Sequence, residues 1–237
     1  MSLILRSAIS GTTKAALSLY KVVGQKKASP INGKLLVNLG CGMAVTPGWT
    51  NIDGSLNAFI SCLPRALVRL IYGISGARLY YSKPEFVNIL KNNKFIFADL
   101  ANSLPLRQNS VDAIFSSHFL EHLRKDEALK LLKKSYKALK PGGILRISVP
   151  DLAYAISLYP QKSQEMLDRF FYVDEGQNDY SSHKYLYDYH SLEALLLEVG
   201  FTNIKKCDYQ EGNCPDVKDL DNRPEESLFV ECQKGNS

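Results

Sequence analysis

The stretch KLLVNLGCGMAVTPGWTNID, residues 34–53, decides the fold. Its first part is a short apolar run that stops at Gly40 and Gly42, which predicts a buried strand leading into a glycine turn. Its last part, TNID, predicts a second short strand that ends at Asp53. Glycine at both turn positions lets the backbone bend sharply and approach a ligand closely. The stretch therefore suggests a ligand site at the ends of two strands.

Further strands and helices follow along the chain. The predicted strands span 34–38, 50–53, 95–98, 111–116, 144–149, 201–208 and 227–233, and the predicted helices include 13–23, 125–139 and 191–199. Strands separated by helical stretches imply a mostly parallel sheet with helices on both faces, which is an α/β fold. In such sheets ligands bind beyond the carboxyl ends of the strands, where the strand order reverses.

Composition bounds the class of protein. A length of 237 residues suffices for one sizeable α/β domain. No apolar run approaches the roughly 20 residues that span a bilayer. The five cysteines are widely spaced and form no C-x-x-C pair, which favours a reducing compartment over a disulfide scaffold. We therefore expect a cytoplasmic protein, with peripheral membrane contact as an open alternative.

Charge is distributed unevenly along the chain. Residues 1–94 hold 12 Lys and Arg but only two acids, Asp53 and Glu85, whereas the remaining residues hold 17 basic and 22 acidic side chains. This asymmetry suggests an anionic partner for the first part: a membrane surface, a phosphorylated substrate or a nucleic acid. Solvated lysines without a partner are the competing interpretation.

Two carboxylates at strand ends indicate the kind of ligand. A nicotinamide dinucleotide fits poorly, because its fingerprint needs a further glycine where Val45 stands and an acid about 20 positions on; Asp53 is only 11 positions beyond Gly42. Asp53 can accept hydrogen bonds from both hydroxyls of a ribose, and Asp99, after the third strand, can accept one from an adenine amine. Together, in this order, they describe an adenosine site.

Several segments taken together resemble one family. LVNLGCG, the acid in NIDG, FADL, VDAIFSSHFLEHL and LKPGGILRISVPDL occur in this order and resemble the class I S-adenosylmethionine-dependent methyltransferases. GCGMAVTPGWTNID, YHSLEALLLEVGF and SLFVECQK are similar to a small bacterial-type branch, methyltransferase type 11-like. The resemblance covers roughly residues 34 to 234. It implies a Rossmann-like, doubly wound seven-stranded sheet with the last strand antiparallel, and S-adenosyl-L-methionine as the cofactor.

The resemblance also implies roles for particular residues. The glycine turn would face the methionine part of the cofactor, Asp53 would hold the ribose, and Asp99 with the backbone of Leu100 would hold the adenine. The residues at the end of the fourth strand would approach the reactive sulfonium. The implied cofactor-binding residues are Asn38, Gly40, Cys41, Gly42, Asp53, Asp99, Leu100, Ser116 and Ser117.

Two features depart from the family pattern. Members usually carry an acid before L-G-C-G, and Asn38 stands there instead; an amide can still accept from an amine or water, but without charge, so cofactor affinity could drop. The segment MAVTPGWT is too short for the helix that usually joins the first two strands. Trp49 in this segment either walls the cofactor or packs in the core.

The string formed by His118, Glu121 and His122 spells H-x-x-E-H, which is typical of one class of zinc peptidases. That chemistry needs both histidines on one helix face and a third protein ligand, and no downstream acid stands out. We therefore predict no metal site and keep a zinc-dependent hydrolase as an alternative. In the methyltransferase interpretation His118 is the first candidate for the base that deprotonates an oxygen acceptor, and His122 is the second. Structural histidines are the competing interpretation.

The acceptor side is less well defined. Residues 151–190 are dense in Tyr and Phe, and the candidates for acceptor contact are Asp151, His183, Tyr187 and His190. A plain aromatic core is the competing interpretation. After Pro64 the sequence predicts an amphipathic helix with Leu67, Leu70 and Ile71 on one side and Arg65 and Arg69 on the other. Such a helix is either a lid packed on the enzyme or a peripheral membrane contact through 56–81.

We expect an N-terminal helical extension over 1–33 and a methyltransferase domain over 34–237, with insertions at 55–92 and 151–190. The expected function is methyl transfer to a small-molecule or carbohydrate- or lipid-linked acceptor, at oxygen. A non-catalytic cofactor-binding protein remains an alternative because of Asn38. Nucleic acid is an unfavoured acceptor, since S-S-H-F stands where an N-P-P-Y-type motif would follow the fourth strand. The oligomeric state stays open.

Overall fold

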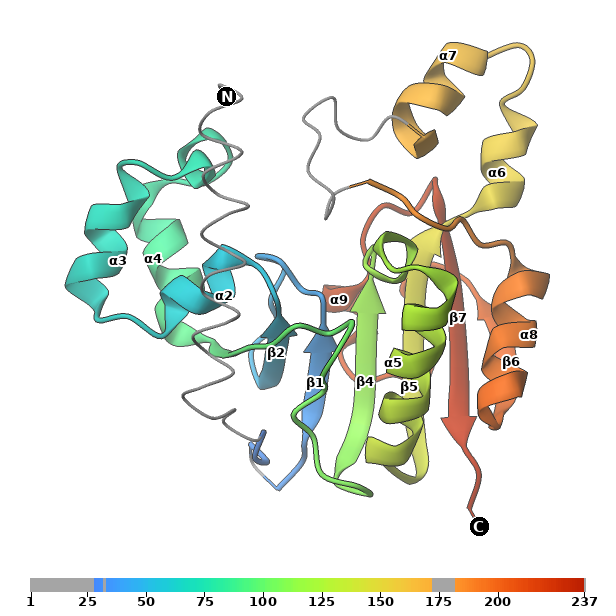
Figure 1. Cartoon of the computed structure of the whole chain (residues 1–237), viewed down its shortest axis with the longest axis horizontal. Helices are drawn as coiled ribbons and strands as arrows, with labels where there is room; N and C mark the ends of the chain where they lie inside the picture. Colours follow the sequence, from blue (N-terminus) through green and yellow to red (C-terminus); the bar gives the residue numbers. More distant parts are fainter. Residues whose placement is uncertain (1–27, 32, 172–181, 237) are drawn as a thin grey trace.

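The computed structural model describes residues 28–31, 33–171 and 182–236. The helix expected over 13–23, and with it most of the expected N-terminal extension, lies outside these residues. Within them the chain forms one twisted sheet, with helices in front of and behind it and a group of helices beside its β3 edge (Figure 1).

The sheet has seven strands in the order β3-β2-β1-β4-β5-β7-β6. The strands are β1 Leu36–Leu39, β2 Trp49–Asp53, β3 Lys94–Phe97, β4 Val111–Ser117, β5 Leu139–Pro150, β6 Phe201–Cys207 and β7 Ser227–Lys234. Strands β1 to β5 pair in parallel, and β7 runs antiparallel to both β5 and β6. The expected doubly wound sheet with an antiparallel last strand is confirmed.

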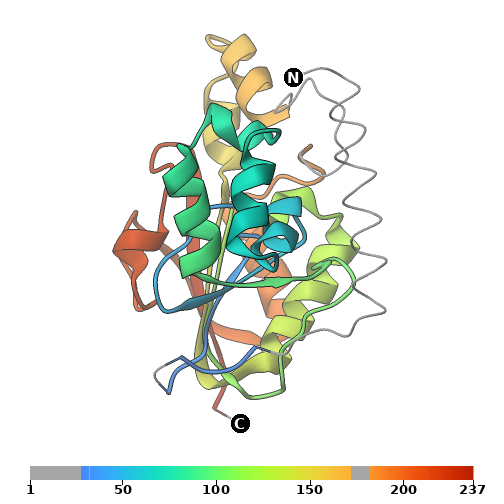
Figure 2. The same ribbon diagram turned by 90° about the vertical axis from the view of Figure 1, so that its left-hand side faces the viewer.

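Helices cover both faces of this sheet. The α-helices are α2 Leu56–Ser61, α3 Arg65–Tyr72, α4 Lys83–Asn92, α5 Lys125–Ala138, α6 Leu152–Ser157, α7 Ser163–Met166, α8 Tyr189–Val199 and α9 Val217–Leu220, with short helices η1 Gly76–Leu79, η2 Leu120–His122 and η3 Leu167–Phe171. Figure 2 shows α5 and α9 on opposite sides of the sheet. Gly200 ends α8 in the left-handed conformation, as its position after the apolar repeat predicts.

Burial follows from this layering. All five residues of β2 and three of the four in β1 are buried, because parallel strands covered on both faces expose neither side to water. The largest apolar cluster joins β1, β4 and β5 to α5 and α8. The register places Leu39 beside both Ile52 and Ser116. The carboxyl ends of the central strands therefore meet at one edge of the sheet.

The connection between β1 and β2 contains turns but no helix, as its length predicts. Trp49 is the first residue of β2 and lies at the end of that strand away from the glycine turn. Its indole is buried, packs edge-on against Phe115, and donates from Nε1 to Asp216 at 2.9 Å. Trp49 therefore belongs to the core cluster under α9, and the alternative that it walls the cofactor is wrong.

Helix α3 presents a different face from the one expected. Val68 is its buried residue, and Ile71 packs beside it on the cluster that contains α4. Leu67 and Leu70, expected on the same side as Ile71, are 45% and 72% exposed. Residues 68 and 71 lie one helical turn apart, so this neighbouring face meets α4 and the leucines turn outward.

A buried ion cluster ties the last two strands to β5. The Arg146 side chain is fully buried and bonds to Asp221 and to Glu231, whose Oε1 lies 3.0 Å from Nη1. Its guanidinium also donates to the carbonyls of Asp208 and Glu211. A guanidinium suits this position because its planar set of donors serves several acceptors at once.

No helix among the described residues is both long and apolar enough to cross a membrane.

Candidate functional site

The glycine turn lies at the carboxyl edge of the sheet, directly after β1. Gly40 and Gly42 both adopt positive φ, at 65° and 53°, a region that other residues rarely occupy. A side chain at position 40 would collide with the ring of Phe119, whereas one at position 42 would meet nothing within 4 Å. The turn is therefore packed on one side and open at its tip.

Asp53 joins this turn to the end of β2. Its Oδ2 accepts a hydrogen bond from the backbone N–H of Gly42 at 2.7 Å, and its Oδ1 accepts one from Ser55 at 2.6 Å. The side chain is buried. Burial and then the nearby Asp53 carboxylate raise the pKa of the Cys41 thiol well above its usual value. The Cys41 side chain is thus a neutral packing group, while Asp53 supplies negative charge beside the turn.

Asn38 has a donor role that the sequence did not reveal. Its Nδ2 lies 3.0 Å from the carbonyl oxygen of Ala44 and 3.2 Å from Oδ1 of Asn51, so the amide holds the short β1–β2 connection against both strands. A carboxylate at this position could donate to neither oxygen. The amide therefore suits the short connection, where the family pattern has an acid.

Asp99 follows β3 on the other side of Asp53. The N–H of Ala98 donates to the backbone carbonyl of Asp53 at 3.0 Å, which brings the two acids to neighbouring strand ends. The Asp99 carboxylate accepts from Asn102 at 2.7 Å and is part-exposed. Leu100 is buried in the main core, so only its backbone remains for a ligand.

The end of β4 completes the edge. Ser116 is buried and donates to the carbonyl of Leu39 at 3.3 Å, while Ser117 donates to Asn222 at 3.3 Å. His118 has a positive φ of 48°, which turns the chain sharply out of the strand. The Ser116 hydroxyl thus links the end of β4 to the end of β1. Ser117 and His118 face the segment that leads into β7.

Both ring nitrogens of His118 have partners. Nε2 lies 2.8 Å from the hydroxyl oxygen of Ser227, and Nδ1 lies 3.3 Å from the guanidinium of Arg223. Arginine can only donate, so Nδ1 accepts and Nε2–H donates to Ser227 in this arrangement. Neither partner was predicted, since the sequence LDNRPEESLF, which leads into β7, shows no sign of contact with a residue more than 100 positions earlier.

Glu121 and two further histidines lie directly beyond His118. Glu121 is fully buried, and its Oε1 lies 3.9 Å from Nε2 of both His122 and His183. The ring centroids of these two histidines are 5.1 Å apart. Burial lowers the pKa of His183, although its bond to the carbonyl of Phe170 and the nearby Glu121 oppose the shift. The structure thus brings together three of the sequence candidates, His118, His122 and His183, around Glu121, which the sequence analysis placed only in the H-x-x-E-H string.

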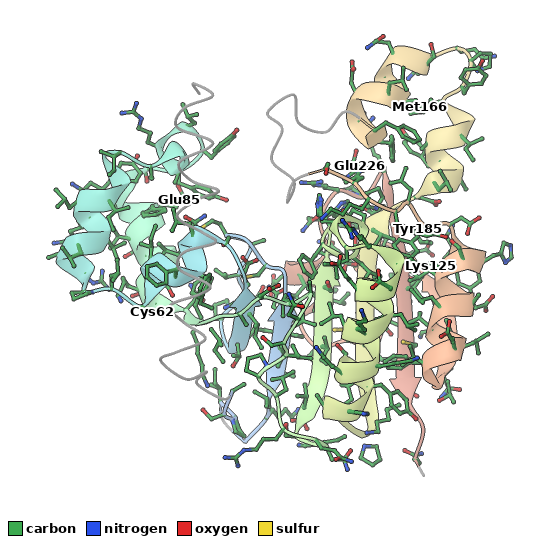
Figure 3. The ribbon with its side chains drawn as sticks, viewed as in Figure 1. Cys62, Glu85, Lys125, Met166, Tyr185 and Glu226 are labelled. Carbon is green, nitrogen blue, oxygen red and sulfur yellow. The ribbon has the colours of Figure 1, made fainter. Side chains whose placement is uncertain are left out.

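The remaining acceptor-side candidates are scattered. Asp151 caps α6 by accepting from Ala153 at 2.9 Å, and its backbone pairs with that of Tyr187. The Tyr187 ring is buried against Tyr185, and its hydroxyl has no hydrogen-bond partner among the described residues. His190 is exposed on α8, where its ring packs beside that of Tyr189; it does not join the cluster of Glu121, His122 and His183. In Figure 3 the labelled Tyr185 and Glu226 lie above the central strands, on the side of β4 and β7.

Comparisons with known proteins point to one chemistry. The family model described as a methyltransferase domain matches residues 74–147. A ubiquinone/menaquinone biosynthesis C-methyltransferase UbiE from Citrobacter koseri is 30% identical over 128 residues, which cover 50% of this chain and 49% of that protein. A phosphoethanolamine N-methyltransferase 1 from Triticum aestivum is 42% identical over 64 residues, 26% of this chain and 13% of that protein. The chain thus spans about half the length, or less, of these curated relatives.

Among solved structures, an S-adenosylmethionine-dependent methyltransferase from Thermotoga maritima, described as a possible histamine N-methyltransferase, superposes with a TM-score of 0.51. It is 14% identical, and the match covers 98% of this chain and 91% of that one. At this identity the likeness shows the fold alone.

Proposed function

Because the chain belongs to the class I S-adenosylmethionine-dependent methyltransferases, we propose that it transfers a methyl group to a small-molecule or carbohydrate- or lipid-linked acceptor, at oxygen. One observation supports this proposal best: the open glycine turn, the buried carboxylate of Asp53 and the part-exposed Asp99 lie together at the carboxyl edge of the sheet. When bound, S-adenosylmethionine supplies an electrophilic methyl group. The residues of this chain have to hold that group and an acceptor in line.

The cofactor-binding side of the proposal uses the first three strand ends. Each oxygen of Asp53 accepts one backbone N–H, and a carboxylate oxygen has two lone-pair sites, so Asp53 retains acceptor capacity for ribose hydroxyls. Asp99 is open to solvent on one side and can accept from an adenine amine. The tip of the turn at Gly42 has room for the amino-acid part of the cofactor.

On the acceptor side we assign His118 the task of taking the proton from an acceptor hydroxyl. His118 directly follows β4 and precedes Phe119, whose ring lies against Gly40 of the glycine turn. Since Arg223 and Ser227 occupy its two nitrogens, an acceptor hydroxyl would have to displace one of them. A small oxygen nucleophile suits that exchange, because it makes the same kind of hydrogen bond.

A lipid-linked acceptor is favoured by the surface of the segment between β2 and β3. Leu67, Leu70, Ile74, Leu79 and Tyr80 are all exposed large apolar side chains here. The segment has no acid between Asp53 and Glu85 and carries Arg65, Arg69 and Arg78. Exposed apolar side chains among cations are typical of a surface that meets anionic lipid headgroups.

The test has two stages. Calorimetric titration with S-adenosylmethionine and S-adenosylhomocysteine should give micromolar-range binding. Labelled methyl groups should then appear in the lipid or glycan fraction of a cell extract, in a form that alkaline hydrolysis or glycan analysis assigns to oxygen. Label on carbon or nitrogen would support methyl transfer by this chain but overturn the assignment of oxygen as the methylated atom. Tight cofactor binding without label in any fraction would favour the non-catalytic alternative.

A further inference from the structure

Glu121 stands out among the buried groups that the proposed methyl transfer does not use. It lies in η2, directly after β4, and its side chain is about 1% exposed. Neither carboxylate oxygen has a hydrogen-bond partner among the described residues. Burying a carboxylate without hydrogen-bond partners costs free energy. A compensating group is therefore expected close to Glu121.

Two imidazole nitrogens face this carboxylate. Nε2 of His122 and Nε2 of His183 each lie 3.9 Å from Oε1 of Glu121. The opposite nitrogens are already engaged: Nδ1 of His122 lies 3.2 Å from the carbonyl oxygen of Ser182, and Nδ1 of His183 lies 2.7 Å from that of Phe170. A carbonyl only accepts, so both Nδ1 atoms carry the hydrogen, and in a neutral ring both Nε2 atoms present a lone pair.

Three lone-pair-bearing groups thus face one another, and no hydrogen-bond donor from the described residues lies between them. His118 does not resolve this, although its Nδ1 lies 3.5 Å from the same Oε1, because that nitrogen accepts from Arg223. A positive ion at the point of convergence would satisfy all three groups. Histidines that bond a carbonyl through one nitrogen and present the other are the usual ligands of transition metals.

We propose that Glu121, His122 and His183 bind one divalent transition-metal ion of the zinc class. The ligand atoms all lie within 4.8 Å of one another. In a tetrahedral zinc site, with bonds of about 2.0–2.2 Å, they would be about 3.4 Å apart, so small side-chain rotations complete the cluster. His122 is 21% exposed, which leaves a route for a water or another ligand to the fourth position. Three protein ligands and one open position are typical of zinc sites that act on a substrate.

The backbone already holds the two parts of this site together. The N–H groups of Lys184 and Tyr185 donate to the carbonyl oxygen of Glu121 at 2.7 and 3.2 Å. The segment that carries His183 is thereby fixed against the turn that carries Glu121 and His122. A bound ion would strengthen this link between the end of β4 and the strand-like stretch that contains Tyr187.

The test uses the full chain, stripped with a chelator and titrated near neutral pH with ZnCl₂ in the calorimeter. We expect one equivalent to bind with micromolar or tighter affinity, and at least a tenfold weaker Kd for His183→Gln and for His122→Gln. The matched control is His190→Gln, which removes an exposed histidine outside the cluster and should bind like wild type. Cys62→Ser serves as a second control against binding by an exposed thiol.

Two further measurements keep the outcome unambiguous. Co²⁺ should give an absorption spectrum of a low-coordinate nitrogen and oxygen site without a thiolate band. Zn²⁺ should raise the Tm of wild type but not of His183→Gln, a comparison made after circular dichroism shows that the variant is folded. Lack of stoichiometric binding by wild type, or wild-type affinity in the double variant His122→Gln/His183→Gln, would overturn the proposal. None of these readouts depends on methyl transfer.

Discussion

The substitution Asp53→Ala tests the carboxylate that joins the glycine turn to β2. Asp53 accepts two backbone hydrogen bonds, at 2.7 Å from Gly42 and 2.6 Å from Ser55, in a buried position. Hydrogen bonds to charged groups contribute about 1.5–3 kcal/mol each. The free energy of unfolding should therefore fall by roughly 3 kcal/mol or more. If the carboxylate also holds the ribose, the Kd for S-adenosylmethionine should rise at least tenfold, about 1.4 kcal/mol.

Asp112→Ala separates loss of stability from loss of the site. Asp112 also accepts two hydrogen bonds, from the N–H of Leu35 at 2.8 Å and from Lys140 at 2.6 Å, but it lies near the start of β4, at the opposite edge of the sheet. This variant should lose stability of a similar order and keep wild-type cofactor affinity.

The assay pairs urea denaturation with calorimetric titration of S-adenosylmethionine for both variants. An unchanged Kd in folded Asp53→Ala would remove Asp53 from the cofactor site. Equal weakening of binding by Asp112→Ala would show that general loosening of the sheet, rather than the carboxylate, governs affinity. Either result refutes the reasoning for Asp53.

Four further substitutions probe separate features. Asn38→Asp, which restores the family acid, should lower the free energy of unfolding by roughly 2 kcal/mol without tighter cofactor binding, because a carboxylate would face two carbonyl-type oxygens; a stable variant with higher affinity would contradict this. His118→Ala should keep cofactor binding by calorimetry and lose methyl transfer to the identified acceptor, and full turnover would remove it as the base. Arg146→Met should cost about 3–5 kcal/mol in urea denaturation, because it removes the guanidinium that faces the buried carboxylates of Asp221 and Glu231 and leaves them with backbone N–H donors and, for Glu231, Lys205 at 3.8 Å; a loss below 1 kcal/mol would contradict this. Leu70→Glu should reduce co-sedimentation with vesicles rich in phosphatidylglycerol, whereas Leu197→Glu, at another exposed leucine, should not; equal binding by both would refute the membrane surface.

Much of the sheet was predictable because its strands are short and buried, and because turn residues such as Gly40 mark where they end. The run before Gly40 and the run that ends at Asp53 mark β1 and β2 closely. The apolar residues of β1 are typical of a buried parallel strand, whereas β2 is buried although three of its five residues are polar. Helix α8 was equally clear, because Gly200 ends it with a positive φ of 102°. The strand β5 begins earlier than predicted, at Leu139, because the chain pairs with Val111 before Pro141.

The orientation of α3 could not be predicted, for a reason that lies in its composition. Apolar side chains occupy more than one face of this helix, so the sequence pattern alone does not decide which face is packed. The choice is made by Phe86, Val87 and Leu90 of α4, which meet Val68. Leu67 and Leu70 remain outside, and their exposure is the observation that favours a lipid surface over a closed lid.

Contacts between distant segments account for what the sequence concealed at the site. The H-x-x-E-H string suggested a metal site that lacked a third ligand, and on that ground no metal was predicted. In the folded chain His118 stays 3.5 Å from Glu121, but Ser227 and Arg223 engage both of its ring nitrogens, so it is not available as a ligand. His183, 61 residues beyond His122, supplies a further histidine at this position, with its Nε2 3.9 Å from Oε1 of Glu121. Spacing along the chain therefore pointed to His122 as a ligand and to Glu121 only as a base, and the fold alone brings His183 beside them.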